Sequence, residues 1–126
     1  MYIYSFEKLE VWKLAKDLCV YIYNLTSKFP TEEKFGLVSQ MRRASVSIAS
    51  NTAEGSSRMS PKDQSHFYNI AYSSAIELLN QLIISQALSF ITEDLLIESR
   101  LKIEPVTGGL SNLKRSTNSK VEGLRS

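Results

Sequence analysis

Apolar residues recur along most of this chain at intervals of three and four, the spacing that puts side chains on one face of an α-helix. We expect a first helix to begin near residues 6–8 and to end near residues 26–28, before Phe29 and Pro30. Pro30 lacks a backbone donor and disfavours helix at Phe29, so a turn is expected there. One face of this helix is apolar, which predicts packing in a bundle; its residues are Leu9, Trp12, Ala15, Cys19, Ile22 and Tyr23.

A second helix is expected from about Glu33 to Ala53 or Glu54, and Gly55 is expected to stop it. Its faces carry short side chains, so a neighbouring helix can approach closely, and polar groups at the contact need hydrogen-bond partners. We interpret four polar residues of this helix and the next as a structural network: Gln40, Asn51, Glu54 and Glu77.

The third segment opens with a helix start, in which Ser60 is the cap, Pro61 takes the first helical position and Asp63 follows. We expect this helix to reach about Ser89. Between His66 and Thr92 only one residue, Glu77, carries a formal charge, and apolar residues surround the helix. A monomeric bundle needs one apolar stripe per helix, so the surplus predicts a homo-oligomer. The interface residues that we predict are Tyr68, Tyr72, Ile76, Leu79 and Ile83.

Glu77 is nearly alone among apolar neighbours. An unpaired buried carboxylate would cost several kcal/mol or take up a proton. We therefore expect Glu77 to pair with Arg42 or Arg43. Those two arginines are adjacent and point about 100° apart on a helix, so one is expected to form a pair while the other faces solvent or a subunit.

The last helix is expected to start at the capping residue Thr92. Pro105 and the pair Gly108-Gly109 predict that this helix kinks or ends early. Residues 114–126 are mostly polar and basic, which is typical of a disordered tail. The pattern thus predicts a bundle domain over residues 1–113 and a tail over residues 114–126.

Composition adds limits. A chain of 126 residues is long enough for one domain with its own core, and its net charge of +2 permits a nucleic-acid partner without requiring one. A single cysteine excludes a disulfide within one chain and fits a reducing compartment. Because no segment is apolar enough to cross a bilayer, we expect a soluble, cytoplasmic protein with no membrane partner.

Residues for catalysis are sparse. Asp63 and His66 lie three apart and could share a metal, but two ligands make an incomplete site, so we interpret them as a capping acid beside an ordinary histidine. Neither a nucleophile elbow nor a phosphate-binding glycine loop is present. We predict no enzyme activity, no cofactor, no metal and no small-molecule substrate.

A family resemblance rests on motifs spread over about residues 6–90. They include Val11-Trp12, Phe29-Pro30, Phe35-Gly36-Leu37, Arg42-Arg43-Ala44 and Ala53-Glu54-Gly55. Together they resemble the four-helix-bundle proteins encoded by intervening sequences in bacterial 23S ribosomal RNA genes. The resemblance implies an all-α, antiparallel up-down-up-down bundle that assembles as a ring, a pentamer, with an undefined role. A distant relative, the accessory protein of diversity-generating retroelements, works with RNA and a reverse transcriptase.

Two function hypotheses follow. In the first, basic residues multiplied around a ring bind RNA phosphates without reading sequence; these residues are Arg42, Arg43, Arg58 and Lys62. In the second, the protein is a structural or protein-interaction scaffold whose arginines form only internal and intersubunit salt bridges. The response of binding to salt distinguishes the two.

Overall fold

The computed structural model describes the backbone of residues 1–125 and the side chains of residues 1–123. This part of the chain contains α1 (Glu10–Thr26), α2 (Leu37–Ser57), α3 (Pro61–Ala87) and α4 (Glu93–Arg125). Two short 3-10 helices, η1 (Ser5–Lys8) and η2 (Thr31–Glu33), precede α1 and α2. Within the described residues there are helices and no strand, so the predicted all-α fold is confirmed.

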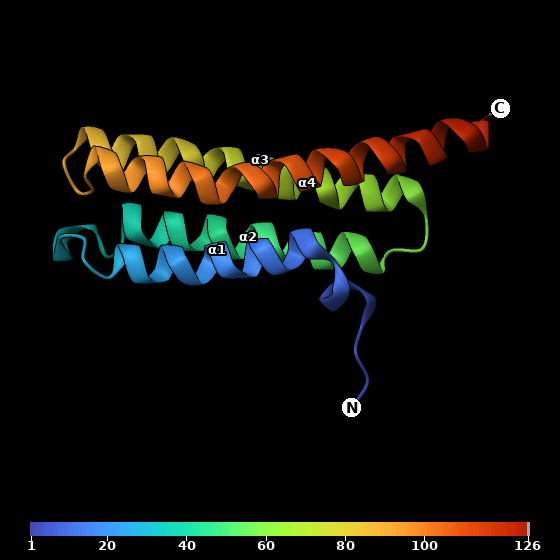
Figure 1. Cartoon of the computed structure of the whole chain (residues 1–126), viewed down its shortest axis with the longest axis horizontal. Helices are drawn as coiled ribbons and strands as arrows, with labels where there is room; N and C mark the ends of the chain where they lie inside the picture. Colours follow the sequence, from blue (N-terminus) through green and yellow to red (C-terminus); the bar gives the residue numbers. More distant parts are fainter. Residues whose placement is uncertain (126) are drawn as a thin grey trace.

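The helices lie in two layers. Figure 1 shows α1 beside α2 in one layer and α3 beside α4 in the other, with each helix running back along the one before it. Contacts between α1 and α2, α2 and α3, α3 and α4, and α1 and α4 close the bundle. The N-terminal segment leaves the bundle at the end where α4 extends past the other helices (Figure 1).

One apolar core runs through the centre of the bundle, and all four helices contribute fully buried side chains to it. Burial of such side chains is the main favourable term in folding. The largest of them include Ile22 from α1, Ile48 from α2, Leu78 and Leu82 from α3, and Leu110 from α4. The periodicity identifies this core only in part: Tyr23, on the predicted apolar face of α1, is 42% exposed, whereas Leu18, outside the predicted set, is buried.

The starts of α3 and α4 are as predicted, whereas α1 and α2 begin two to four residues later than expected. The Ser60 Oγ accepts a hydrogen bond from the backbone N–H of Asp63 at 3.1 Å, and Pro61 is the first residue of α3. The Thr92 Oγ1 accepts from the backbone N–H of Leu95 at 3.2 Å and caps α4. Each bond satisfies one of the donors that a helix start leaves free.

Gly55 does not stop α2, which continues to Ser57. A Cβ atom at position 55 would lie 2.7 Å from Cε1 of Tyr68. The glycine is therefore required because α2 and α3 approach closely there, not because the helix ends. Gly109 plays the same part between α4 and α1, where a Cβ would lie 2.8 Å from Cγ2 of Val11.

The last helix is longer than expected. α4 continues through Pro105 and the two glycines to Arg125, so neither the early end nor a disordered tail over residues 114–125 is found. Ile103, Val106 and Thr117 stay buried against the bundle, and this packing outweighs the hydrogen bond that Pro105 removes. Ser126 lies outside the described residues.

Candidate nucleic-acid interface

Arg42 is a structural residue at the end of α1. Its Nε donates to Oγ1 of Thr26 at 3.0 Å, and its Nη2 donates to the backbone oxygen of Tyr23 at 3.2 Å. The guanidinium also lies 4.6 Å from the centre of the Tyr23 ring. The last carbonyls of a helix carry partial negative charge, and the Tyr23 oxygen also accepts from the backbone N–H of Ser27, so Arg42 adds a cation that stabilises the end of α1. Its partner is thus a helix end and not the predicted carboxylate.

Arg43, the next residue, is exposed and borders two surface hollows. The larger, of about 640 Å³, lies along α2; we call it the Phe35 groove, and its walls include Tyr23, Lys34, Phe35, Arg42, Arg43 and Val46. The smaller, of about 280 Å³, lies between α2 and α3; we call it the polar groove, and it is lined by Gln40, Arg43, Ala44, Ser47, Ser74 and Glu77.

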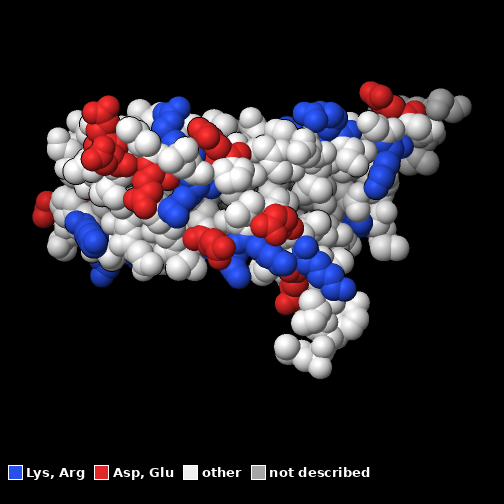
Figure 2. All heavy atoms as spheres, in the orientation of Figure 1, with Lys and Arg blue, Asp and Glu red and all other residues white. Residues whose placement is uncertain are grey.

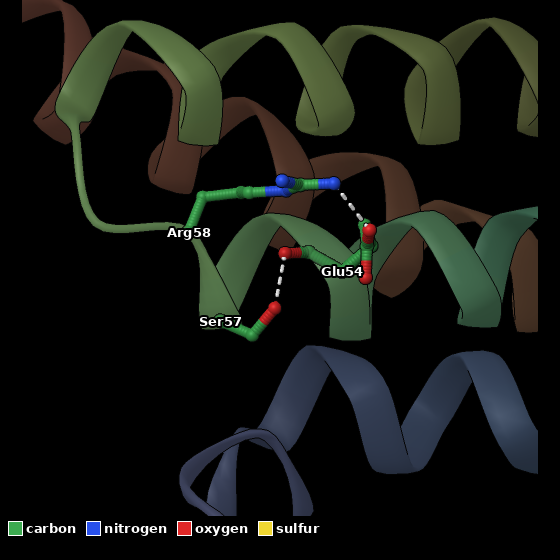
Figure 3. A network of polar contacts seen from close by, with 3 residues as sticks. All are labelled: Glu54, Ser57 and Arg58. Atoms are coloured by element: carbon green, nitrogen blue, oxygen red, sulfur yellow. Dashed lines mark hydrogen bonds and ion pairs between the residues drawn. The ribbon is translucent and has the colours of Figure 1, made fainter.

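Arg58 is held at the other end of α2. Its Nη2 donates to Oε1 of Glu54 at 2.6 Å, and its guanidinium lies 4.7 Å from the centre of the Phe67 ring. Ser57 donates to the backbone oxygen of the same Glu54 at 2.8 Å (Figure 3). Arg58 and Glu54 thus form an exposed ion pair, whereas Lys62, in the first turn of α3, is exposed without such a pair among the described residues.

The four predicted phosphate-binding residues do not form one patch. Arg42 and Arg43 lie in the second turn of α2, and Arg58 follows its last residue. At 1.5 Å per residue, Arg42 and Arg58 are about 24 Å apart along the helix. Only Arg43 and Lys62 of the four leave their charge uncommitted to a contact among the described residues.

The predicted polar network is divided into separate contacts. Asn51 Nδ2 donates to the backbone oxygen and Oγ of Ser47, at 2.9 and 3.0 Å, and the Ser47 and Ser74 hydroxyls lie 2.8 Å apart. This chain of bonds links α2 to α3. Gln40 is exposed at the polar groove, and Glu54 belongs to the Arg58 pair described above.

The predicted pairing of Glu77 with Arg42 or Arg43 is wrong. Glu77 is exposed, and its Oε1 accepts a hydrogen bond from Nε2 of Gln81 at 3.3 Å. A carboxylate that stays in contact with water is stabilised by hydration, so no ion pair is required to offset a cost of burial. Apolar neighbours in the sequence do not indicate that Glu77 is buried, because successive residues of a helix point in different directions.

The predicted interface residues fall into three groups. Tyr68 is only 4% exposed and packs against Gly55, so its assignment to an intersubunit contact is wrong. Tyr72 and Leu79 are half-buried against the core. Ile76 and Ile83 are 44% and 41% exposed and remain available to a partner.

Charges of both signs alternate on the face formed by α1 and α4. Figure 2 shows lysines and arginines interspersed with aspartates and glutamates on this face, over the body of the bundle. Such a mixture gives no strong field of one sign. A phosphate-binding surface is therefore better sought on α2 than on this face.

Other chemistry in the described part of the chain is limited. In residues 1–125, no three His, Cys, Asp or Glu side chains are placed to hold a metal ion. The His66 ring lies edge-on against Phe67, with ring centres 5.2 Å apart. None of the helices described is both long and apolar enough to cross a bilayer.

Two tyrosines have shifted acidities. Burial raises the pKa of Tyr68 above its ordinary value. Burial also raises the pKa of Tyr21, as does the nearby Glu98 carboxylate, while a hydrogen bond with Ser99 opposes the shift. Both are structural rings and neither borders the Phe35 groove.

Sequence reasoning missed Lys34 and Phe35 as candidate site residues. Phe35 is 90% exposed, and Lys34 Nζ lies 5.5 Å from the centre of its ring. The available signal was one aromatic residue directly after the polar run 31–34 and before a glycine. Such a residue is either an anchor into the core or a surface contact, and only the fold separates the two.

Comparison with known proteins gives a family and a fold. Residues 7–112 match the family model of the 23S rRNA-intervening sequence protein. A crystal structure of a protein with unknown function from the S23 ribosomal protein family of Bacteroides thetaiotaomicron matches with a TM-score of 0.60 and 20% identity, covering 88% of this chain and 97% of that one. At this identity the likeness shows the fold alone. Among curated proteins, none matches.

Proposed function

This chain belongs to the 23S rRNA-intervening sequence protein family, and from this premise we propose that it is a non-enzymatic, oligomeric helical bundle that associates with RNA. The family's name links it to a ribosomal RNA, and the structural neighbour carries a ribosomal-protein label together with unknown function. The proposal adds a physical basis to that link, which is phosphate binding by exposed cations of α2 and α3.

The observation that carries the proposal is the division of labour between Arg42 and Arg43. Arg42 is used inside the protomer, whereas Arg43 is exposed beside the apolar and cationic walls of the Phe35 groove. Lys62 supplies a second exposed cation at the start of α3. Contacts of lysine and arginine with phosphates give affinity without sequence specificity and release counterions, so binding weakens steeply with salt.

Self-association is the second part of the proposal. The outer face of α3 exposes Ile76 and Ile83, which are seven residues apart, with Asn80 between them. Seven-residue spacing keeps side chains on one seam of paired helices, and a polar residue within such a seam selects register. We propose a ring of antiparallel bundles, a pentamer, in which this face contacts a neighbouring copy.

A ring would strengthen weak binding at each copy. Each protomer offers few free cations, but linked sites act on one RNA at a high effective concentration. The proposal therefore needs the oligomer for affinity as well as for burial of the α3 face.

The oligomer is tested by Ile76→Glu combined with Ile83→Glu, with the molar mass measured by light scattering. Charges placed on the seam are expected to reduce the mass to that of one chain. The matched control is Ile97→Glu with Leu101→Glu, because these α4 residues are 49% and 63% exposed and lie off the seam. A wild-type protein that is already monomeric at micromolar concentration would refute the ring.

RNA binding is tested by fluorescence anisotropy over a salt series. Arg43→Gln combined with Lys62→Gln is expected to weaken binding and to lower the slope of log K against log salt by about two. Lys8→Gln combined with Lys13→Gln removes the same charge from exposed residues of η1 and α1 and is the control. Absence of binding at low salt, or equal losses in both double variants, would count against the proposed surface.

The second candidate function is a scaffold without nucleic acid. The observation that favours it is that two of the four predicted phosphate binders, Arg42 and Arg58, make contacts inside the protomer. An oligomer that binds no RNA at low salt would select this alternative.

A further inference from the structure

Packing within the protomer does not explain why an aromatic residue stands at position 35. Its side chain is 90% exposed in the short connection between η2 and α2, and it adds nothing to the core. An aromatic ring in water forgoes the burial that usually stabilises it. Its exposure in the lining of the Phe35 groove indicates a contact with something outside the protomer.

The walls of the Phe35 groove combine rings, apolar side chains and cations. Val38 and Val46 provide the apolar surface, and Lys34 and Arg43 provide exposed charge. No acidic side chain is found among the described residues that line it. Glu33, the acidic residue nearest in sequence, directs its Oε2 to the backbone N–H of Leu37, 3.3 Å away. The groove is therefore suited to an anion that also has an apolar, flat part.

The two rings differ in their availability. Tyr23 is 42% exposed, but the Arg42 guanidinium lies over its ring, 4.6 Å from the ring centre, and is fixed by its bonds to the end of α1. Phe35 is 90% exposed, and the flexible Lys34 side chain places its Nζ 5.5 Å from the centre of the Phe35 ring. Phe35 thus offers the more accessible stacking platform, and Arg43, from the second turn of α2, lines the same groove.

The required combination of flat ring and negative charge is that of a nucleotide in a single strand. An inorganic anion would leave the rings and valines unused, and an apolar peptide would leave Lys34 and Arg43 without partners. A duplex keeps its bases stacked inside, whereas a single strand presents base faces to aromatic side chains and phosphates to cations. Resting on the proposed RNA association, we propose that the Phe35 groove binds single-stranded RNA, with a base stacked on Phe35 and its phosphates near Lys34 and Arg43.

The test compares Phe35→Ala, Phe35→Trp and wild type for binding of a labelled 12-nucleotide oligouridylate and of a 12-base-pair RNA duplex at low salt. Phe35→Ala is expected to weaken oligouridylate binding about 5- to 160-fold, the range for loss of one base stack, and to leave duplex binding unchanged. Phe35→Trp is expected to retain binding. Because Phe35 is 90% exposed, all variants should melt like wild type.

Met59→Ala is the matched control, since Met59 is a large apolar side chain, 98% exposed, in the connection between α2 and α3. Its oligouridylate affinity is expected to equal that of wild type.

If wild type binds RNA but Phe35→Ala binds oligouridylate equally well, or loses both RNAs alike, the stacking site is refuted while RNA association stands. If Phe35→Ala changes only the oligomer mass, the groove holds a second copy and the inference is refuted. If wild type binds no RNA, both proposals fail.

Discussion

Leu82 and Ile83 are neighbours in the chain and of equal hydrophobicity, but they have opposite surroundings. Leu82 is 0% exposed in the core, whereas Ile83 is 41% exposed on the outer face of α3. The inner face of α3 is closed by packing against the other helices, whereas the outer face leaves Ile76 and Ile83 44% and 41% exposed. The apolar content of a helix therefore indicates how much apolar surface has to be buried. Only the fold shows which part of that surface is buried within the protomer.

The largest expected effect on stability comes from comparing substitutions on the two faces of α3. Leu82→Ala should lower the free energy of unfolding by about 2–5 kcal/mol, because it leaves a cavity among fully buried side chains. Ile83→Ala should lower it by less than about 1 kcal/mol in the separated protomer, since its side chain is already in contact with water. Urea unfolding at low protein concentration measures both. Equal losses would show that the outer face is as closed as the inner one.

A second pair of substitutions contrasts two glycines. Gly55→Ala should lower the free energy of unfolding by about 1–3 kcal/mol, because the new Cβ would overlap the buried Tyr68 ring. Gly108→Ala should raise it by up to about 1 kcal/mol, because a Cβ there meets nothing within 4 Å and alanine favours helix. Thermal unfolding of the two variants gives the signs. A stabilised Gly55→Ala would mean that α2 and α3 are looser than described.

These glycines mark what the sequence was unable to predict. Periodicity located the four helices and part of the core, and capping chemistry located the start of α3, because both depend on neighbours in the chain. By the same local logic, Gly55 was predicted to stop its helix and Pro105 to kink or end its helix. Their effect is decided instead by a partner helix, Tyr68 in one case and the packing of α4 in the other.

The candidate site follows the same rule. The 100° separation of Arg42 and Arg43 predicted different roles for them, and they have different roles. The actual partner of Arg42 was not predictable, because it depends on where the end of α1 lies beside α2. Phe35 was missed because exposure in a connection is set by the path of the chain and not by local pattern.

The two arginines allow a smaller test. Arg42→Gln should lower the free energy of unfolding by about 1 kcal/mol, since it removes a cation from the end of α1. Arg43→Gln should change it by less than about 0.5 kcal/mol, because its side chain is exposed. In denaturant unfolding, Arg42→Gln should therefore cause the larger loss of stability. In RNA binding, Arg43→Gln should cause the larger loss of affinity. The same rank in both assays would contradict the division of labour.

The smallest effect concerns alkaline pH. Burial raises the pKa of Tyr68 above its ordinary value of 10.0, so between these two values the folded chain keeps a proton that the unfolded chain releases. Stability should be fully present below pH 10 and should decline as pH rises through the folded pKa. Tyr68→Phe should reduce this decline, with Tyr21 maintaining part of it. Tyr2→Phe, whose ring is 75% exposed, is the control in pH-dependent thermal melts, and should leave the decline unchanged.

The central claim is that the faces which the protomer leaves uncovered serve other copies and RNA. Native mass spectrometry of wild-type protein mixed with a single-stranded oligoribonucleotide tests it most directly, over a series of ammonium acetate concentrations. The account predicts particles that contain several 14.2 kDa chains with RNA attached, and release of that RNA as the salt concentration rises. A single 14.2 kDa chain without RNA at every salt concentration would contradict it.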